Sequence, residues 1–189
     1  MVLFLFLGLF LSHLKLFSIV YNTDKMSGER KEVKMNIFFL DYNPELCAMY
    51  HCDKHVIKML VEYCQLLSIA NRSCGLDEGY ALTHFNHPSA KWVRESLDNW
   101  MYVRELSVWL NKEYRYRYEK SYNHKSFDVT ETLSVPPLPS RGLTKVALAM
   151  PVEYKKYDSA VECYRQYYKG EKATIATWRK RGKPYWWFY

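Results

Sequence analysis

Five polar residues recur on what the sequence predicts to be one face of a long helix. They are His51, His55, Lys58, Glu62 and Gln65. At about 100° per residue they fall in a stripe about 80° wide. Imidazole, ammonium and carboxylate groups that lie together can transfer protons and shift one another's pKa. The stripe therefore predicts a general acid/base site, or else the solvent-facing side of a surface helix in which Lys58 and Glu62 form an ordinary i,i+4 ion pair.

The acid/base interpretation allows two kinds of chemistry. In the first, Glu62 is a catalytic carboxylate and His55 positions the substrate or handles protons. In the second, His51 and His55 bind a metal ion, with Glu62, His84 or His87 completing the site. The sequence contains no HExxH motif. We therefore predict no metal and no cofactor, and we keep a metal-dependent hydrolase using His51 and His55 as an alternative.

The last 27 residues combine cations with aromatic side chains. Seven Lys or Arg residues stand there against one acid. Lys and Arg contact phosphates, and aromatic rings stack on exposed bases. A cationic segment of this kind resists burial, so it predicts a nucleic-acid interface. About half of its aromatic residues are expected in the core, from a set that includes Tyr164, Tyr167, Tyr168, Trp178 and Trp186.

Helix signals dominate the sequence. Asn43-Pro44-Glu45 predicts the start of a helix that runs to about residue 71, and Asn86-His87-Pro88 predicts a second helix to about residue 120. Alternation typical of strands is nearly absent. We predict an all-α fold with one compact domain of two long helices plus several short ones. The short helices are expected at about 144–150, 159–169 and 171–180, after a proline-rich connector at 135–139.

The composition excludes several classes of protein. The chain has 189 residues, of which 17% are aromatic, with only 7 Gly and 7 Pro. These values are unlike those of disordered or collagen-like chains. Five Cys without a CxxC pair argue against a disulfide scaffold and for a reducing compartment. The net charge of +7 favours an anionic partner.

The first 34 residues differ from the rest. Residues 2–20 are apolar but are interrupted by His13 and Lys15, which makes them marginal for a membrane span. They also lack the charged region that precedes a signal-peptide core. Met35 is followed by an apolar segment typical of the start of a domain. We therefore divide the chain into an N-terminal extension at 1–34, non-native or an anchor, and a domain at 35–189.

Three motifs together resemble one known family. The first is Asp53-Lys54-His55-x6-Glu62, and the second is Asn86-His87-Pro88-x3-Trp92. The third is Tyr164-x2-Tyr167-Tyr168 with Trp178. In their order and spacing over about residues 36–189, they resemble the pyrimidine-dimer DNA glycosylases of the phage endonuclease V type and their uncharacterised bacterial relatives.

The resemblance implies an all-α enzyme that binds duplex DNA, flips a nucleotide and joins glycosylase and strand-cleaving lyase steps. In this family an amine attacks the sugar C1′ and forms a Schiff base. Glu62 matches the assisting Glu, and His55 matches a His near the substrate phosphate or sugar. The family nucleophile is its N-terminal α-amine. In this chain the expected amine is that of Met35, Lys58 or Lys54, unless lyase chemistry is absent.

Val61 and Gln65 stand where family members carry arginines beside the Glu. We expect a DNA-repair N-glycosylase with AP-lyase activity on damaged pyrimidines. We expect it to be a monomer in the cytoplasm, or in the host cytoplasm if it is viral. It should contact a membrane only if residues 1–20 are retained. Alternatives are a non-enzymatic base-stacking nucleic-acid-binding protein, the metal-dependent hydrolase, and a membrane-anchored structural protein. The expected catalytic residues are Glu62, His55 and Lys58, and the expected DNA contacts are Lys54, Arg165, Lys172, Trp178, Arg179, Lys180 and Arg181.

Overall fold

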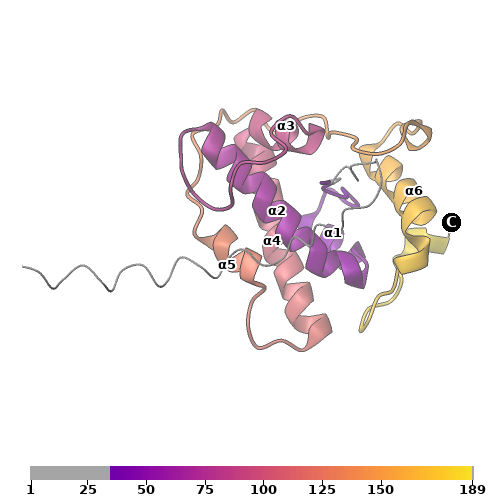
Figure 1. The fold of residues 1–189 in the computed structure, drawn as a ribbon. Coiled ribbons are helices and arrows are strands. Elements are labelled where there is room, and N and C mark those ends of the chain that lie inside the picture. Colours follow the sequence, from indigo (N-terminus) through magenta and orange to yellow (C-terminus); the bar gives the residue numbers. More distant parts are fainter. Residues whose placement is uncertain (1–34, 189) are drawn as a thin grey trace, which may run out of the picture. The chain divides into compact units, whose positions relative to one another are not determined.

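The computed structural model describes residues 35–188, and within them it confirms the predicted all-α fold (Figure 1). By contacts the chain divides into two units, Met1–Val33 and Lys34–Tyr189. The N-terminal extension predicted at 1–34 lies outside the described residues. The helices are α1 (Pro44–Tyr50), α2 (Asp53–Ser73), α3 (Pro88–Glu95), α4 (Leu97–Tyr118), α5 (Lys125–Glu131) and α6 (Ala160–Lys172). Short 3₁₀ turns cover η1 (Val152–Tyr154), η2 (Ala173–Ile175) and η3 (Tyr185–Phe188).

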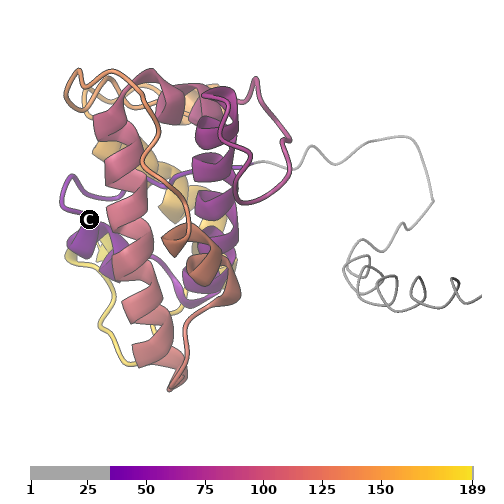
Figure 2. The same cartoon turned by 90° about the vertical axis from the view of Figure 1, so that its left-hand side faces the viewer.

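The two long helices form the centre of the described unit. α2 and α4 run side by side, and α5 packs against both of them (Figures 1 and 2). A buried polar contact joins the long helices, because Trp100 of α4 donates from Nε1 to Asn71 of α2 at 3.0 Å. Among the helices at 35–188, none is both long and apolar enough to cross a membrane.

The first predicted helix is in fact two helices, which is a correction to the sequence interpretation. α1 ends at Tyr50, His51 adopts an extended conformation, and α2 begins at Asp53. The cause lies far away in the sequence. The guanidinium of Arg117 donates to the carbonyls of Met49 at 2.8 Å and His51 at 2.7 Å. These carbonyls would otherwise need partners at the helix end, so α1 ends there without a glycine.

The second predicted helix is also divided, at Ser96. Its backbone is extended, and its hydroxyl accepts from the N–H of Asp98 at 3.2 Å, which caps α4. Serine at this position offers the backbone a partner that competes with a continuous helix. α3 therefore ends at Glu95, and the N–H of Leu97 donates to Pro139 O at 2.9 Å.

The short elements differ from prediction in three places. Residues 144–150 are not helical, because tertiary partners hold their backbone: Asn99 accepts from Thr144 N–H at 3.0 Å, and Tyr164 donates to Ala147 O at 2.7 Å. In the predicted helix at 171–180, the first half is the end of α6 and η2, and residues 176–180 are irregular. α5 was not predicted, although His124 caps it by accepting from the N–H of Ser126.

Residues 35–40 pass through the interior without regular secondary structure, and all six are buried. Their backbone groups find partners among side chains. The N–H of Asn36 donates to the carboxylate of Glu62 at 2.9 Å, and Ile37 O accepts from the hydroxyl of Tyr63 at 2.5 Å. Buried backbone groups must be paired to avoid a large desolvation cost. Two neighbouring residues of α2 thus hold the start of the described chain in place.

Candidate active site

The carboxylate of Glu62 lies at the edge of the core, with a side chain that is 11% exposed. Oε1 forms an ion pair with Nζ of Lys58 at 2.9 Å, and Oε2 accepts from the N–H of Asn36 at 2.9 Å. Burial raises the pKa of Glu62, and Lys58, Asn36 and Lys172 offset part of that rise. A partly desolvated carboxylate with a raised pKa is suited to proton transfer.

His55 lies on the same helix but is almost fully buried, with 3% of its surface exposed. Its ring stacks on Phe38 with centroids 4.5 Å apart, and Nδ1 lies 2.7 Å from the hydroxyl of Tyr168. Burial is the main reason that the pKa of His55 falls to about 2, and the nearby His51, Lys58 and Lys172 lower it further. His55 is therefore neutral at physiological pH.

Phe38, on which the ring of His55 stacks, has an unusual backbone conformation. Its φ is 40°, in the left-handed region that bulky residues rarely adopt. The ring stacks on His55 and also on Tyr167, whose centroid is 6.0 Å away. Backbone strain of this kind persists where surrounding contacts enforce it, and such positions cluster at functional sites.

Lys172, near the end of α6, completes the group. Its Nζ lies 5.0 Å from the ring centroid of Tyr167 and 5.9 Å from that of Phe38. The same ammonium affects the pKa of both His55 and Glu62. The structure therefore brings together the three predicted catalytic residues and one residue predicted to contact DNA. We name Glu62, Lys58, His55 and Lys172 the Glu62 cluster.

Sequence reasoning missed three partners of the cluster: Asn36, Phe38 and Tyr168. Asn36 contributes its backbone N–H, and Phe38 contributes its ring through a strained turn, neither of which has a sequence signal. Tyr168 belongs to a quoted motif, and its spacing predicted that it could be buried. Its hydrogen bond to His55 spans 113 positions and depends on tertiary packing.

His51 does not belong to the cluster, so the predicted five-residue stripe is wrong. It sits between α1 and α2 and is fully buried. Nδ1 lies 2.7 Å from Cys47 O, and Nε2 lies 2.9 Å from the hydroxyl of Tyr63. Both ring nitrogens thus contact protein groups. Over residues 35–188, no group of three or more His, Cys, Asp or Glu side chains could hold a metal ion, so the metal-dependent hydrolase lacks a ligand set there.

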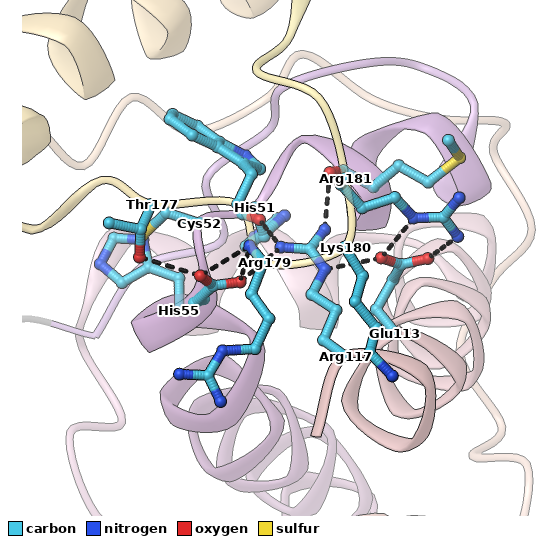
Figure 3. A network of polar contacts seen from close by, with 12 residues as sticks. His51, Cys52, His55, Glu113, Arg117, Thr177, Arg179, Lys180 and Arg181 are labelled. Atoms are coloured by element: carbon cyan, nitrogen blue, oxygen red, sulfur yellow. Dashed lines mark hydrogen bonds and ion pairs between the residues drawn. The ribbon is translucent and has the colours of Figure 1, made fainter. Parts of the chain in front are cut away.

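A buried polar network fixes the C-terminal segment against the start of α2 (Figure 3). The carboxylate of Asp53 accepts from Arg179 N–H at 2.9 and 3.0 Å, from Thr177 Oγ1 at 2.9 Å and from Arg117 at 3.2 Å. Glu113 lies between two guanidinium groups, with Arg117 at 2.8 Å and Arg181 at 2.5 Å. Because Arg117 contacts both acids, one side chain joins α4, α2 and the end of the chain.

Three of the cations predicted to contact DNA form ion pairs within the fold. Arg181 pairs with Glu113, Lys180 with Glu119, and Arg165 with Asp41. Trp178 is buried and donates to Tyr50 O at 3.0 Å. The expectation that half of the named aromatics are core was too low, since all five are buried: Tyr164, Tyr167, Tyr168, Trp178 and Trp186.

Lys54 and Arg179 remain at the surface near the start of α2. The backbone of Arg179 is held by Asp53, and its guanidinium lies 5.2 Å from the ring centroid of Tyr118. Asp53 precedes Lys54 in the helix. The polar network thus holds the backbone of Arg179 at the start of α2, where the exposed Lys54 directly precedes His55 of the Glu62 cluster.

A separate cavity of about 370 Å³ lies elsewhere, between the 143–148 segment and the start of α6. Its lining includes Tyr42, Lys145, Lys155 and Tyr157, and it contains none of the predicted site residues. The Glu62 cluster is therefore the candidate site because of the chemistry of its side chains, not because it lines this cavity.

Comparisons with protein-family models, with curated proteins and with solved structures find no match to this chain.

Proposed function

We propose that this protein is a DNA N-glycosylase with AP-lyase activity on damaged pyrimidines, and that Glu62 is its catalytic carboxylate. The observation that carries the proposal is the environment of Glu62. The carboxylate is held between an ammonium group and a backbone N–H, has a raised pKa, and lies on the same helix as the neutral imidazole of His55. Such a group can stabilise the positive charge that develops at the sugar as the base leaves.

The reaction requires an amine beside this carboxylate. The amine nitrogen forms a bond to C1′ while the bond from C1′ to the base breaks. The base leaves with the electron pair and takes up a proton. Ring opening of the sugar then gives the imine, and loss of a C2′ proton expels the 3′ phosphate and cuts the strand. In this proposal, Glu62 accepts and returns the protons that these steps move.

Of the three predicted amines, those of Lys58 and Met35 are compatible with the position of Glu62. Nζ of Lys58 is 2.9 Å from Oε1. A chain that starts at Met35 would carry its α-amine one residue before the Asn36 N–H that donates to Oε2 at 2.9 Å. Lys54 lies one turn earlier on α2 and is exposed. A covalent trap followed by peptide mapping distinguishes these amines, because each lies in a different peptide.

The proposed partner is duplex DNA from which a nucleotide is flipped, since C1′ in a stacked duplex is hard to reach. The surface cations Lys54 and Arg179 can contact phosphates on the α2 side of the cluster. Lys172 adds positive charge within the cluster itself.

The test is strand nicking on UV-irradiated DNA, with borohydride added to trap an imine. We expect Glu62→Gln to lower nicking about 100-fold or more, the scale of a lost acid/base or electrostatic group. Folding and DNA binding should stay close to wild type, because the amide keeps the shape of the side chain. The exposed Glu105 of α4 provides the matched control, and Glu105→Gln should leave all three measurements unchanged.

A wild-type protein that neither nicks DNA nor forms a covalent adduct with borohydride would refute the proposed enzyme activity. The second candidate, a non-enzymatic base-stacking protein, would then be favoured by the exposed rings near the C-terminal cations. Tyr116 is 48% exposed and lies 4.6 Å from the guanidinium of Arg181, and Tyr185 is 60% exposed. In that case Tyr116→Ala should weaken DNA binding, while Glu62→Gln should not.

A further inference from the structure

Asn36 is buried, and both polar atoms of its side chain form hydrogen bonds within the fold. The residue is 4% exposed. Its Oδ1 accepts from the N–H of Ile37 at 2.8 Å, and its Nδ2 donates to Ala149 O at 2.8 Å. Its backbone N–H donates to Oε2 of Glu62 at 2.9 Å. One residue thus contacts α2, the backbone at 149 and the turn that follows it.

The side chain of Asn36 fixes the turn that follows it. Asparagine side chains can accept from backbone N–H groups of neighbouring residues, which holds the chain in turns rather than in helix or strand. Here Oδ1 lies 2.8 Å from the N–H of Ile37 and 3.5 Å from that of Phe38, whose φ is 40°. Because the ring of Phe38 stacks on His55, the turn that presents an N–H to Glu62 also positions this ring.

Ala149, the acceptor for Nδ2 of Asn36, is itself held by α6. Its N–H donates to the hydroxyl of Tyr164 at 3.2 Å, and this hydroxyl donates to Ala147 O at 2.7 Å. Asn36 therefore connects Glu62 on α2 to Tyr164 on α6 through a chain of hydrogen bonds. The members of the Glu62 cluster come from the same two helices. The side chain of Asn36 thus joins the two elements that must keep a fixed distance at the candidate site.

We propose that Asn36 is a positioning residue, whose side chain holds the turn so that its own backbone N–H stays on the carboxylate of Glu62 and the ring of Phe38 stays in place. The effect on catalysis rests on the proposed function, but the positioning itself does not. The other partner of the carboxylate, Lys58, is 61% exposed, and an exposed lysine is held weakly. The buried N–H is therefore the rigid partner. A displacement of about 1 Å at a catalytic group can lower a rate about 100-fold.

The amide proton of Asn36 reports this contact directly, because its chemical shift follows the protonation of the carboxylate that accepts from it. It is measured in ¹H–¹⁵N spectra of the ¹⁵N-labelled full chain between pH 4 and 8. Lys58 and Tyr63 of α2 and Lys172 of α6 interact electrostatically with the same carboxylate. Glu62→Gln isolates the part of the shift that belongs to Glu62, and it should abolish that part. A wild-type amide that does not shift with pH would overturn the proposal.

Asn36→Ala removes both side-chain contacts but keeps the backbone N–H that contacts Glu62. We expect the pH-dependent shift of the residue 36 amide to lose most of its amplitude, and strand nicking to fall about 10-fold or more. Asn99→Ala is the matched control, because Asn99 is also a buried asparagine, and its side chain donates to Trp92 O and to Thr144 instead. It should leave the amide shift and the nicking rate close to wild type.

Asn36→Ser is the second variant, in case Asn36→Ala does not fold. Its hydroxyl can still accept from the N–H of Ile37 but is too short to reach Ala149, so we expect an amide shift smaller than in wild type. A folded variant of either kind that keeps the full shift would refute the positioning role. If the wild-type chain shows the shift but does not nick DNA, the catalytic proposal fails and the positioning role stands. If the variants lose the shift but nick at the wild-type rate, Asn36 has no role in the reaction.

Discussion

Burial acts in opposite directions on the two central side chains of the Glu62 cluster. It raises the pKa of Glu62 and lowers that of His55 to about 2. Both changes follow from the same cost of placing a charge in a poorly solvated position. The carboxyl group becomes easier to protonate, and the imidazole becomes harder to protonate. In the proposed reaction, this difference favours proton transfer by Glu62 and a neutral role for His55.

Stability should fall as the pH is lowered, because two imidazoles are held neutral in the fold. The pKa of His51 falls to about 4 and that of His55 to about 2, from 6.5 for both. Between pH 6.5 and about pH 4, the unfolded chain binds these two protons and the folded chain does not. We expect each imidazole to cost about 2 kcal/mol of unfolding free energy between pH 7 and 5.

Two other groups modify this slope. His124, whose pKa burial also lowers, acts in the same direction. Glu62 opposes it, because a raised pKa lets the folded state bind a proton before the unfolded state does. Urea unfolding at a series of pH values measures the slope, and His51→Gln should reduce it by about one proton. A slope that His51→Gln leaves unaltered would contradict a neutral buried His51.

At the scale of the elements, one arginine determines where two helices meet. Arg117 of α4 is 1% exposed and contacts the carbonyls of Met49 and His51 as well as the carboxylates of Asp53 and Glu113. Its position explains both the end of α1 and the attachment of the C-terminal segment. Because of the break between α1 and α2, His51 does not lie on the helix that carries His55. Its ring instead lies edge-on to Phe38 of residues 35–40, with centroids 6.4 Å apart.

Arg117→Met should destabilise the protein by about 3 kcal/mol or more, since it leaves buried carboxylate and carbonyl groups without their partner. Arg115→Met is the control, because Arg115 lies on the exposed side of the same helix, and it should change stability by less than about 0.5 kcal/mol. Denaturant unfolding measures both. Equal stabilities for the two variants would show that the network contributes little.

At the scale of the whole molecule, the start of the described chain is part of the core. Residues 35–40 are buried, and the contact units separate Met1–Val33 from the rest. We expect residues 35–189, expressed alone, to be mainly helical and to unfold cooperatively. Far-UV circular dichroism and a thermal melt test this expectation. An aggregated or non-helical product would show that residues 1–34 are needed for folding.

DNA binding should depend on the exposed cations rather than on those engaged within the fold. Lys54→Glu and Arg179→Glu should each weaken binding and flatten the dependence of log K on log salt by about one phosphate contact or more, through lost counterion release. Lys91→Glu is the control, since Lys91 is exposed on α3. Fluorescence anisotropy at several salt concentrations measures the slopes. Equal slopes for all three variants would place the DNA interface elsewhere.

The sequence alone was enough to predict the all-α class, the starts of the helices that begin at Pro44 and Pro88, and the pairing of Lys58 with Glu62. These features depend on contacts within a few residues, which composition, capping residues and helical spacing encode directly. The tertiary structure decided the breaks at His51 and Ser96, the burial of His55 against Phe38 and Tyr168, and the attachment of the C-terminal cations to Asp53 and Glu113. Apart from the local cap that Ser96 forms with Asp98, these features depend on partners that lie 17 to 126 positions away along the chain, such as Phe38 for His55 and Arg179 for Asp53. Local periodicity carries no information about such partners, because only the folded chain brings them within hydrogen-bonding distance and removes water from between them.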